Sequence, residues 1–420
     1  MIAQDIAASP CPPFYTKQPI LDSKRSIWGY DLLGGEANKG ICDILLRTES
    51  AASLSSSTYV RLQEAMERGK KIVVGFDAAS ILSGMAHALP PSSGVVRLLP
   101  GEGDAQALAA SLQSLRAEGY YTCMEVIPDA PLPDAVRSQA DILALDVGAE
   151  HPDPGAQELL QRNGALLLAR GVGTMEQFRA AKDAGFSLFQ GPFFKEAEHV
   201  PDRTLASSEV SRLHLLRLIE AEDPDFKELA LAIRSDVAIS FRLLSYLNSA
   251  YFGFRHTIQS IDQAIMLLGW NKLRSWIRAV ILVDMAGKGE VPQELAELSL
   301  QRGKFFELLT EAYDYWGFNP STIFLVGLFS LMDALLGMPM DTLVELLPLD
   351  AKIKAALRRN PNNEYAPLWG LRDAMEDGDW PKLEILTRKL CLDPLLVKEL
   401  FAASRDWAGG FFLATDRARG

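Results

Sequence analysis

Residues 14–35 read FYTKQPILDSKRSIWGYDLLGG, and the runs FYTKQPIL and SIWGYDLL within them are rich in residue types that form β-strands. Six further runs of this kind follow before residue 195: KIVVGFD, GVVRLLP, YYTCMEVI, DILALDV, GALLLARGV and SLFQGPFF. Helical stretches that end at a glycine separate several of the runs, which predicts βα units around a mostly parallel sheet. Eight runs in fewer than two hundred residues favour a closed, TIM-like (β/α)8 barrel, with its chemistry at the carboxyl ends of the strands.

The second half of the chain has a different pattern, because β-rich runs give way to stretches with helical spacing from EVSRLHLLRLIEA onward. These stretches show no repeat period and predict one irregular, all-helical bundle. We expect a flexible N-terminal tail at 1–13, the barrel at 14–197, a linker at 198–208, the helical domain at 209–410 and a C-terminal tail at 411–420.

Composition indicates which kinds of partner and which cellular compartment are compatible with this chain. A formal net charge of −12 gives no broad attraction to nucleic acid or to anionic lipid. The four cysteines form no CxxC pair, which is typical of free thiols in a reducing compartment. No apolar stretch reaches the roughly 20 residues of a spanning helix, and the N-terminus lacks the features of a signal peptide. We expect a cytoplasmic protein that neither binds nucleic acid nor inserts into a membrane.

Two stretches of the N-terminal half, KQPILDSKRSIWGYDLL and GFSLFQGPFF, resemble the EAL domain of bacterial cyclic di-GMP phosphodiesterases. The resemblance covers roughly residues 14–197. The C-terminal half is similar to an HDOD domain, an all-helical signalling module related to HD hydrolases, through SDVAISFRLLSYLNSAYFGFRHTIQSIDQAIMLLG. The two resemblances together imply a bacterial EAL–HDOD signalling protein.

Active EAL enzymes hold two divalent metals with several acids and an asparagine, so the resemblance identifies the positions to inspect. Asp31 stands in place of the glutamate that gives the family its name. The other positions of the implied metal site hold Gly75, Arg97, Glu125, Val126, Ala144, Arg170 and Gly173. Gly35 replaces the arginine that grips a ligand phosphate in the family.

Most ligating acids are therefore absent, and two arginines stand where they would repel divalent cations. We expect a degenerate barrel that is not an enzyme, with no catalytic residue, no metal and no cofactor. The family's mode of dimerisation is not carried over, because IPDAPLPDA replaces the loop that couples two barrels in active relatives, and the oligomeric state stays open.

The polar residues that remain in the implied site could each be there for one of two reasons. Gln18, Asp31 and Gln190 are candidates for residual ligand binding. Buried amides that hydrogen-bond strand ends would equally explain Gln18 and Gln190, and both explanations stay open. For Glu125 and Asp146 a structural role as solvated or capping carboxylates is favoured.

The helical half contains no His-Asp dipeptide and only two of the five histidines, so the sequence predicts no metal site there. The stretch NSAYFGFRH at 248–256 is a candidate interaction surface through Asn248, Tyr251, Phe254 and His256. Aromatic residues at a helix end are more often core residues, which is favoured for Tyr251 and for Phe252.

Two hypotheses from different classes remain. In the first, the chain is an inactive signalling protein that acts by binding other signalling or regulatory proteins. In the second, the barrel is a receptor that binds cyclic di-GMP without hydrolysing it and relays the signal to the HDOD domain. Loss of the phosphate-gripping arginine favours the first.

Overall fold

The computed structural model describes residues 15–34, 63–127, 132–148, 164–198, 200–201, 203–221, 231–233, 236–248, 258, 261–287, 289–313 and 317–416. The chain divides into two compact units. One contains Met1–Phe194 and Asp373–Pro394, and the other contains Lys195–Arg372 and Leu395–Gly420.

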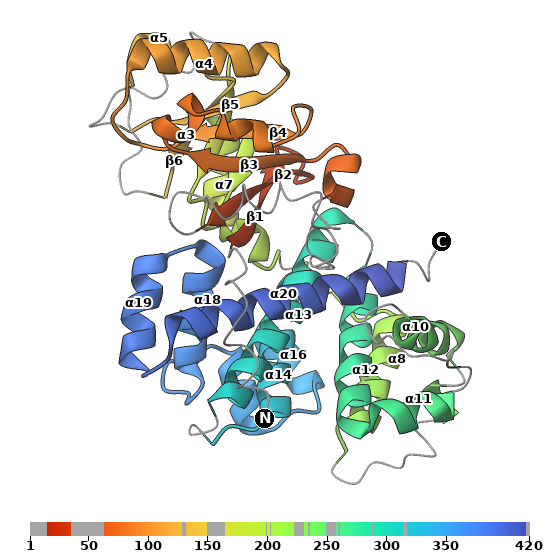
Figure 1. Cartoon of the computed structure of the whole chain (residues 1–420). Coiled ribbons are helices and arrows are strands. Elements are labelled where there is room, and N and C mark those ends of the chain that lie inside the picture. Colours follow the sequence, from red (N-terminus) through yellow and green to blue (C-terminus); the bar gives the residue numbers. More distant parts are fainter. Residues whose placement is uncertain are drawn as a thin grey trace. The chain divides into compact units, whose positions relative to one another are not determined.

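The first unit is built on a closed barrel of eight strands that follow one another in sequence order (Figure 1). The strands are β1 (Tyr15–Asp22), β2 (Ile27–Gly34), β3 (Lys71–Phe76), β4 (Gly94–Leu98), β5 (Tyr121–Glu125), β6 (Ile142–Asp146), β7 (Leu166–Arg170) and β8 (Leu188–Gln190). Strands β2 to β8 are parallel, whereas β1 is antiparallel to both of its neighbours, β2 and β8. The predicted (β/α)8 barrel is confirmed, with β1 reversed.

Helices follow several of the strands, namely α3 (Ala78–Leu82), α4 (Ala105–Ala117), α5 (Asp134–Arg137) and α7 (Met175–Asp183). Local sequence explains where two of them begin, because Asp104 caps α4 and Thr174 forms a capping box with Gln177 at α7. Both end near a glycine with positive φ, Gly119 or Gly185, as the sequence pattern predicts.

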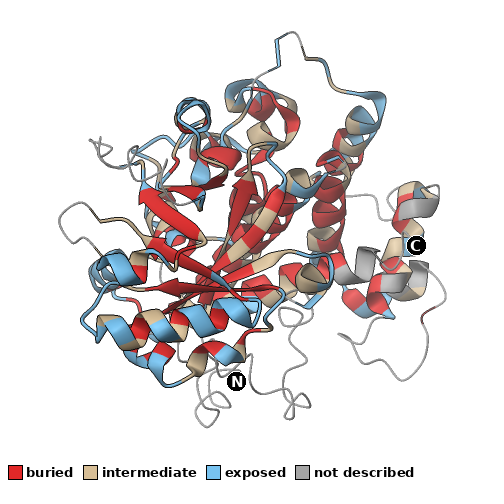
Figure 2. Cartoon of the chain, turned by 90° about the horizontal axis from the view of Figure 1, so that it is seen from above, coloured by how far each residue is buried: buried red, intermediate tan, exposed pale blue. Residues whose placement is uncertain are grey.

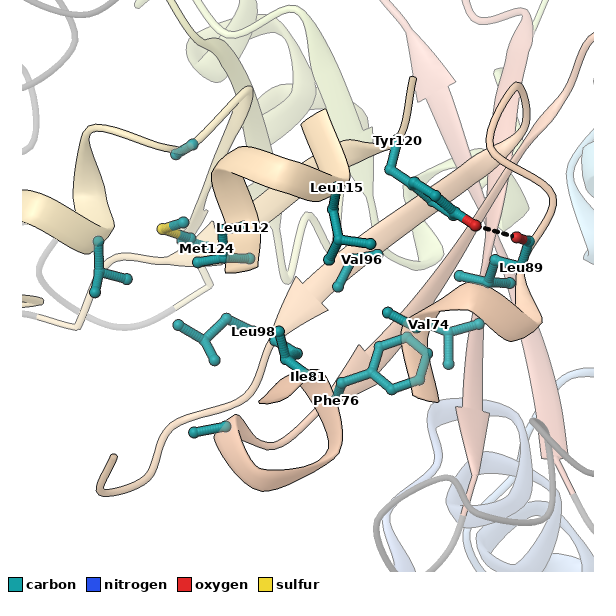
Figure 3. Close-up of a cluster of buried hydrophobic side chains, with 14 of the residues drawn as sticks. Val74, Phe76, Ile81, Leu89, Val96, Leu98, Leu112, Leu115, Tyr120 and Met124 are labelled. Carbon is teal, nitrogen blue, oxygen red and sulfur yellow. Dashed lines mark hydrogen bonds between the residues drawn. The ribbon is translucent and has the colours of Figure 1, made fainter. Parts of the chain in front are cut away.

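The barrel is stabilised by a core between the sheet and these helices. Val96 and Met124 project from the strands toward Leu115 and Leu112 of α4, and Val74 lies beside Phe76 (Figure 3). In the same cluster the buried hydroxyl of Tyr120 donates to the carbonyl oxygen of Leu89 at 2.7 Å. The strands are buried while the outer faces of the helices are exposed (Figure 2), as expected for amphipathic helices on a sheet.

A segment close to the C-terminus belongs to the barrel unit. It includes the end of α18 (Ala366–Asp377) and all of α19 (Trp380–Lys389). Gly378, with φ +68°, lies so near the end of β2 that an added Cβ would be 3.3 Å from Leu33 Cβ. The division expected from the sequence assigned these residues to the helical domain, and the domain limits themselves stay a prediction.

The second unit is helical. Its described helices are α8 (Ser207–Ile219), α10 (Val237–Leu247), α11 (Ile261–Leu268), α12 (Trp270–Met285), α13 (Glu290–Ala312), α14 (Pro320–Leu328), α15 (Met332–Leu336), α16 (Met340–Leu346), α17 (Ala351–Leu357) and α20 (Pro394–Asp416), with the start of α18. Helices α13 and α14 pack closely where Gly303 meets Gly327, since a Cβ on Gly327 would lie 2.5 Å from the Gly303 nitrogen. In the described ranges no helix is long and apolar enough to cross a membrane.

The end of the chain differs from the expected tail at 411–420. Helix α20 continues to Asp416, and Phe411 and Phe412 are buried. Phe411 packs against Trp276 and Trp407 with ring centroids 6.4 and 6.1 Å apart. The prediction of a tail from residue 411 is therefore wrong, because these aromatic side chains are part of the core. Residues 1–14 and 417–420 lie outside the described part.

Candidate functional site

The inner face of the barrel changes from apolar to polar toward one end. Side chains alternate along a strand, so every second residue points inward. The deeper inner layer is apolar and consists of Ile20, Val73, Val95, Cys123, Ile142, Ala144, Leu168 and Leu188. One step further, at the carboxyl ends of the parallel strands, comes a polar layer that we call the mouth cluster: Gln18, Asp31, Arg97, Glu125, Arg170 and Gln190.

Asp31 and Arg97 form a buried ion pair in the mouth cluster, with side chains 1% and 6% exposed. Burial opposes the charge on Arg97, but the carboxylates of Asp31 and Glu125 outweigh it, so the pKa of Arg97 is raised above its ordinary value. The pairing is incomplete, because Asp31 Oδ1 and Arg97 Nε are buried without a hydrogen-bond partner.

Gln190 connects the two sides of the mouth cluster. Its Nε2 donates to Asp31 Oδ2 at 2.9 Å and to Gln18 Oε1 at 2.8 Å, and its Oε1 accepts from Arg170 Nε at 3.3 Å. Gln18 Nε2 in turn donates to the carbonyl oxygen of Glu376 at 3.0 Å. The structure therefore brings together Gln18, Asp31 and Gln190, the candidate ligand-binding residues, in one network.

Arg170 forms the second ion pair of the mouth cluster, with Glu125. This pair is more exposed than the first, with side chains 28% and 22% accessible. Two guanidinium groups and two carboxylates make the formal charge of the mouth cluster zero. Glu125 is therefore bound in an ion pair inside the barrel, which differs from the solvated or capping carboxylate favoured from the sequence.

The other aligned positions contribute little to the mouth. Ala144 is buried in the apolar inner layer, and Val126 packs with the outer core, so only Glu125 of that pair faces inward. Gly75 lies beside Arg97 in the β3–β4 register, and the Gly173 amide donates to Gln177 Oε1. Gly35 lies outside the described residues.

Asp146, at the end of β6, is exposed, and its Oδ1 accepts from the Gly148 amide at 2.9 Å. This is the capping role favoured for it from the sequence. Asp146 therefore shapes the loop after β6.

The described residues of the mouth do not fit the two-metal centre of the resembling family. A pair of divalent cations needs several carboxylates that are free to coordinate. Here Asp31 and Glu125 are each paired with an arginine, and nowhere in the described ranges do three His, Cys, Asp or Glu side chains gather as a metal site would require.

Only one residue of the candidate surface in the helical half is described. Asn248 forms two hydrogen bonds with Ile258, in which its Oδ1 accepts from the backbone nitrogen at 2.7 Å and its Nδ2 donates to the carbonyl oxygen at 2.9 Å. Asn248 therefore holds Ile258 close to the C-terminal end of α10. Tyr251, Phe254 and His256 lie outside the described residues, as does Phe252.

Sequence reasoning missed two features of the mouth cluster. It treated Arg97 and Arg170 only as charges that would repel divalent cations, and it did not identify the acids with which they pair, Asp31 and Glu125. It also missed the contact of Gln18 with Glu376, for which the sequence carries no local signal because 358 residues separate the two.

Comparison with known proteins finds one matching family model and relatives along nearly the whole chain. Residues 205–337 match the family model of the HDOD domain. The chain is 28% identical over 404 residues to the uncharacterized protein YuxH of Bacillus subtilis, which covers 94% of this chain and 97% of the relative. It is 27% identical over 406 residues to the cyclic di-GMP phosphodiesterase CdgJ of Vibrio cholerae, covering 94% and 92%. An EAL domain protein from Listeria monocytogenes superimposes with a TM-score of 0.32 at 15% identity, over 44% of this chain and 87% of that one.

A closed barrel followed by an HDOD domain is the EAL–HDOD signalling architecture predicted from the sequence, and that prediction is confirmed. The prediction that the chain is not an enzyme is overturned, because CdgJ, related over nearly the whole length, is a cyclic di-GMP phosphodiesterase. The error was to conclude inactivity from the residues at the aligned positions alone.

Proposed function

We propose that the chain is a signal-transduction protein of cyclic di-GMP signalling that acts in the cytoplasm by binding a regulatory protein through its HDOD domain. The observation that carries this proposal is a set of three exposed, large apolar side chains on α10 and α11, two helices in contact; we call these residues the α10–α11 surface. Phe241 is 53% exposed, Met266 78% and Leu267 49%. Large apolar side chains grouped on adjacent elements are typical of protein interaction sites.

The test uses a photo-crosslinking amino acid at position 266 in cells, with position 385 as the matched control. Ile385 on α19 is also a strongly exposed apolar residue, at 67%, but belongs to the other unit. We expect one protein to crosslink at 266 and not at 385. The purified partner should then bind the chain, and Phe241→Ser with Met266→Lys should weaken binding at least tenfold while Ile385→Lys leaves it unchanged.

The proposal would be contradicted by equal crosslinking at positions 266 and 385. It would also be contradicted by a partner that binds the Phe241→Ser/Met266→Lys variant as tightly as the unsubstituted chain. Circular dichroism and melting of each variant would show that the folds are retained. Both substituted residues are exposed, so we expect stability changes within about 0.5 kcal/mol.

A second candidate function is recognition of cyclic di-GMP at the mouth cluster, and its support is the similarity to CdgJ over 94% of the chain. Arg170 is the accessible cation of the cluster. To bind here, a phosphodiester would have to replace Glu125 as the partner of Arg170. It would form a charge-assisted hydrogen bond with Arg170 of the same type as the existing one. The cost of breaking the existing ion pair would lower the affinity.

Calorimetric titration with cyclic di-GMP, with and without magnesium, tests this second candidate, and chromatography of the same samples measures turnover. We expect Arg170→Gln to weaken binding at least tenfold. Arg116→Gln is the matched control, because Arg116 pairs with Asp141 before the start of β6, at the opposite end of the barrel. Absence of binding at millimolar nucleotide would reject recognition at the mouth, and product formation would add catalysis to it.

A further inference from the structure

Two glutamine side chains connect the mouth cluster to a helix near the other end of the chain. Gln190 Oε1 accepts from Arg170 Nε at 3.3 Å, and Gln190 Nε2 donates to Gln18 Oε1 at 2.8 Å. Gln18 Nε2 then donates to the carbonyl oxygen of Glu376 at 3.0 Å. These three hydrogen bonds, which we call the amide chain, run without interruption from Arg170 on β7 to the last turn of α18.

The groups at its two ends fix the direction of every bond in the amide chain. A guanidinium group can only donate, and a backbone carbonyl can only accept. Each glutamine must therefore turn its oxygen toward Arg170 and its nitrogen toward Glu376. If Gln190 were reversed, its oxygen would face the carboxylate of Asp31, to which Nε2 now donates at 2.9 Å. A change at one end therefore cannot be absorbed by turning an amide around.

Gln190 is buried, so bulk water cannot replace a bond that it loses. Only 2% of its surface is exposed, and both its amide oxygen and its amide nitrogen are engaged. A buried amide that loses a partner keeps the full cost of its desolvation. Hydrogen bonds in series also polarise one another. Loss of Arg170 as a donor therefore weakens the bonds that Gln190 and Gln18 make further along.

At the far end, the amide chain completes the C-terminus of a helix. Helix α18 ends at Asp377, and Gly378 follows with φ +68°, which is a common way for a helix to stop. The last carbonyls of a helix have no partner within the helix itself. Gln18 supplies a donor to one of them, the carbonyl of Glu376. The attachment of this turn to the barrel therefore depends on a side chain of β1.

The turn after α18 also packs on β1 close to Gln18. A Cβ on Gly378 would lie 3.7 Å from Thr16 Cγ2, and Thr16 is a buried residue two positions before Gln18 on the strand. Within α18, the residues up to Arg372 belong to the helical unit and those from Asp373 belong to the barrel unit. The segment that Gln18 holds is therefore the one through which the chain passes from one unit into the other.

We propose that the amide chain couples the state of Arg170 at the mouth to the attachment of residues 373–394 to the barrel. The inference deepens the second candidate function and rests on it for the identity of the ligand alone. A phosphodiester that replaces Glu125 draws the Arg170 guanidinium toward itself, and the bond to Gln190 is the longest of the three. Its loss is passed along the amide chain and loosens the end of α18. By reciprocity, a loosened segment raises the affinity of the mouth for the nucleotide.

The coupling is tested first without ligand, by hydrogen–deuterium exchange of the full chain followed by mass spectrometry. Arg170→Met keeps the length of the side chain and removes every donor. We expect exchange in peptides from 373–394 to rise at least threefold, while exchange in α4 stays unchanged.

Two control variants accompany Arg170→Met. Glu125→Gln removes the ion pair but keeps the donor to Gln190, so exchange at 373–394 should stay unchanged. Arg116→Met removes an arginine that pairs with Asp141 at the opposite end of the barrel, and it should also leave that exchange unchanged.

Gln18→Glu distinguishes the coupling from a general loss of stability. An ionised glutamate can accept from Gln190 but cannot donate to the Glu376 carbonyl, so only the last bond is broken. Exchange at 373–394 should rise as in Arg170→Met, and the double variant should show no further rise, because both substitutions break the same chain. Gln18→Leu provides the same comparison if Gln18→Glu does not fold.

The second stage repeats the exchange measurement with cyclic di-GMP at saturating concentration. Exchange at 373–394 should rise at least threefold in the unsubstituted chain and no further in Gln18→Glu, which should bind the nucleotide at least threefold more tightly. A chain that does not bind the nucleotide would reject the second candidate function, and the ligand-free comparison would still decide the coupling.

Three results would overturn the inference. They are unchanged exchange at 373–394 in Arg170→Met, fully additive effects of Arg170→Met and Gln18→Glu, or nucleotide binding at the mouth that leaves exchange at 373–394 unchanged.

Discussion

The Asp31–Arg97 pair shows how the residue at one position determines the electrostatic environment of the side chain next to it. In a barrel whose mouth held several acids, a buried guanidinium would displace cations, whereas here it gives Asp31 a permanent counter-charge. Removing one partner of such a pair leaves the other charged and buried, which costs far more than the pair itself contributes.

Arg97→Met should therefore destabilise the barrel unit by about 3–5 kcal/mol. The double variant Arg97→Met/Asp31→Leu should recover most of this loss, because it leaves no unpaired charge. Calorimetric melting of the full chain measures both. Arg116→Met is the control: its pair with Asp141 is exposed, with side chains 39% and 22% accessible, so the loss should stay under about 1 kcal/mol. Equal losses at the two arginines would contradict this account.

Cys123 lies in the apolar inner layer below the mouth cluster, and its burial raises the pKa of the thiol to about 12. Only the thiolate reacts, so at pH 8 about one molecule in ten thousand is reactive at this site. We expect iodoacetamide to modify the exposed Cys391 within minutes and Cys123 only after unfolding, as followed by peptide mass spectrometry. Burial favours the protonated thiol of Cys123, so its contribution to folding is complete below the pKa of an unfolded thiol. Raising the pH from there toward the folded-state pKa of about 12 should therefore destabilise the barrel. Rapid native labelling of Cys123 would show that the barrel opens.

At the scale of elements, the contact between α13 and α14 depends on two glycines. A Cβ on Gly327 would meet backbone atoms of α13 at 2.5 Å, whereas one on Gly303 would come no closer than 3.0 Å to the Phe324 carbonyl oxygen. Backbone cannot move as a side chain can, so the first collision forces the helices apart.

Gly327→Ala should therefore lower the melting temperature of the helical unit markedly, by several kcal/mol in unfolding free energy. Gly303→Ala should cost much less, because the roughly 1 kcal/mol gain in helix propensity offsets a milder contact. Differential scanning calorimetry of the two variants provides the comparison. A smaller effect for Gly327→Ala than for Gly303→Ala would mean that the helices do not cross at these residues.

The elements were largely predictable from sequence because their signals are local. The runs around Val73 and Val95 combine β-branched residues with bounding turns, and the helices after them carry their own caps. The inward polar positions could also be located by alternation along each strand. The pairing of Arg170 with Glu125 could not, because it depends on side-chain reach between strands that are 45 residues apart.

At the scale of the whole molecule, residues 373–394 belong to the barrel unit although they follow most of the helical unit in sequence. No local sequence pattern predicts that residues 373–394 pack with the barrel unit. It depends on a close approach, in which Gly378 lies against Leu33 and Glu376 accepts from Gln18. The barrel unit is therefore completed by chain from both ends of the sequence.

A single cut between Thr204 and Leu205 should consequently leave the two fragments associated. Thr204 is exposed, so a protease site placed there is accessible. Size-exclusion chromatography at micromolar concentration should show one peak containing both fragments, since residues 373–394 stay with the barrel. The matched control adds Gly378→Val, whose branched side chain meets Leu33 at an unfavourable φ of +68°. We expect that variant to separate in mild urea, and separation of the unsubstituted fragments in buffer would refute the arrangement.

The direction of β1 matters for anyone who labels or immobilises this protein. Since β1 opposes every other strand, Tyr15 lies beside Gly34, at the same end as the mouth cluster. A fluorophore joined through a short spacer just before Tyr15 would therefore report events at the mouth, whereas a bulky affinity tag there would be placed beside the mouth cluster.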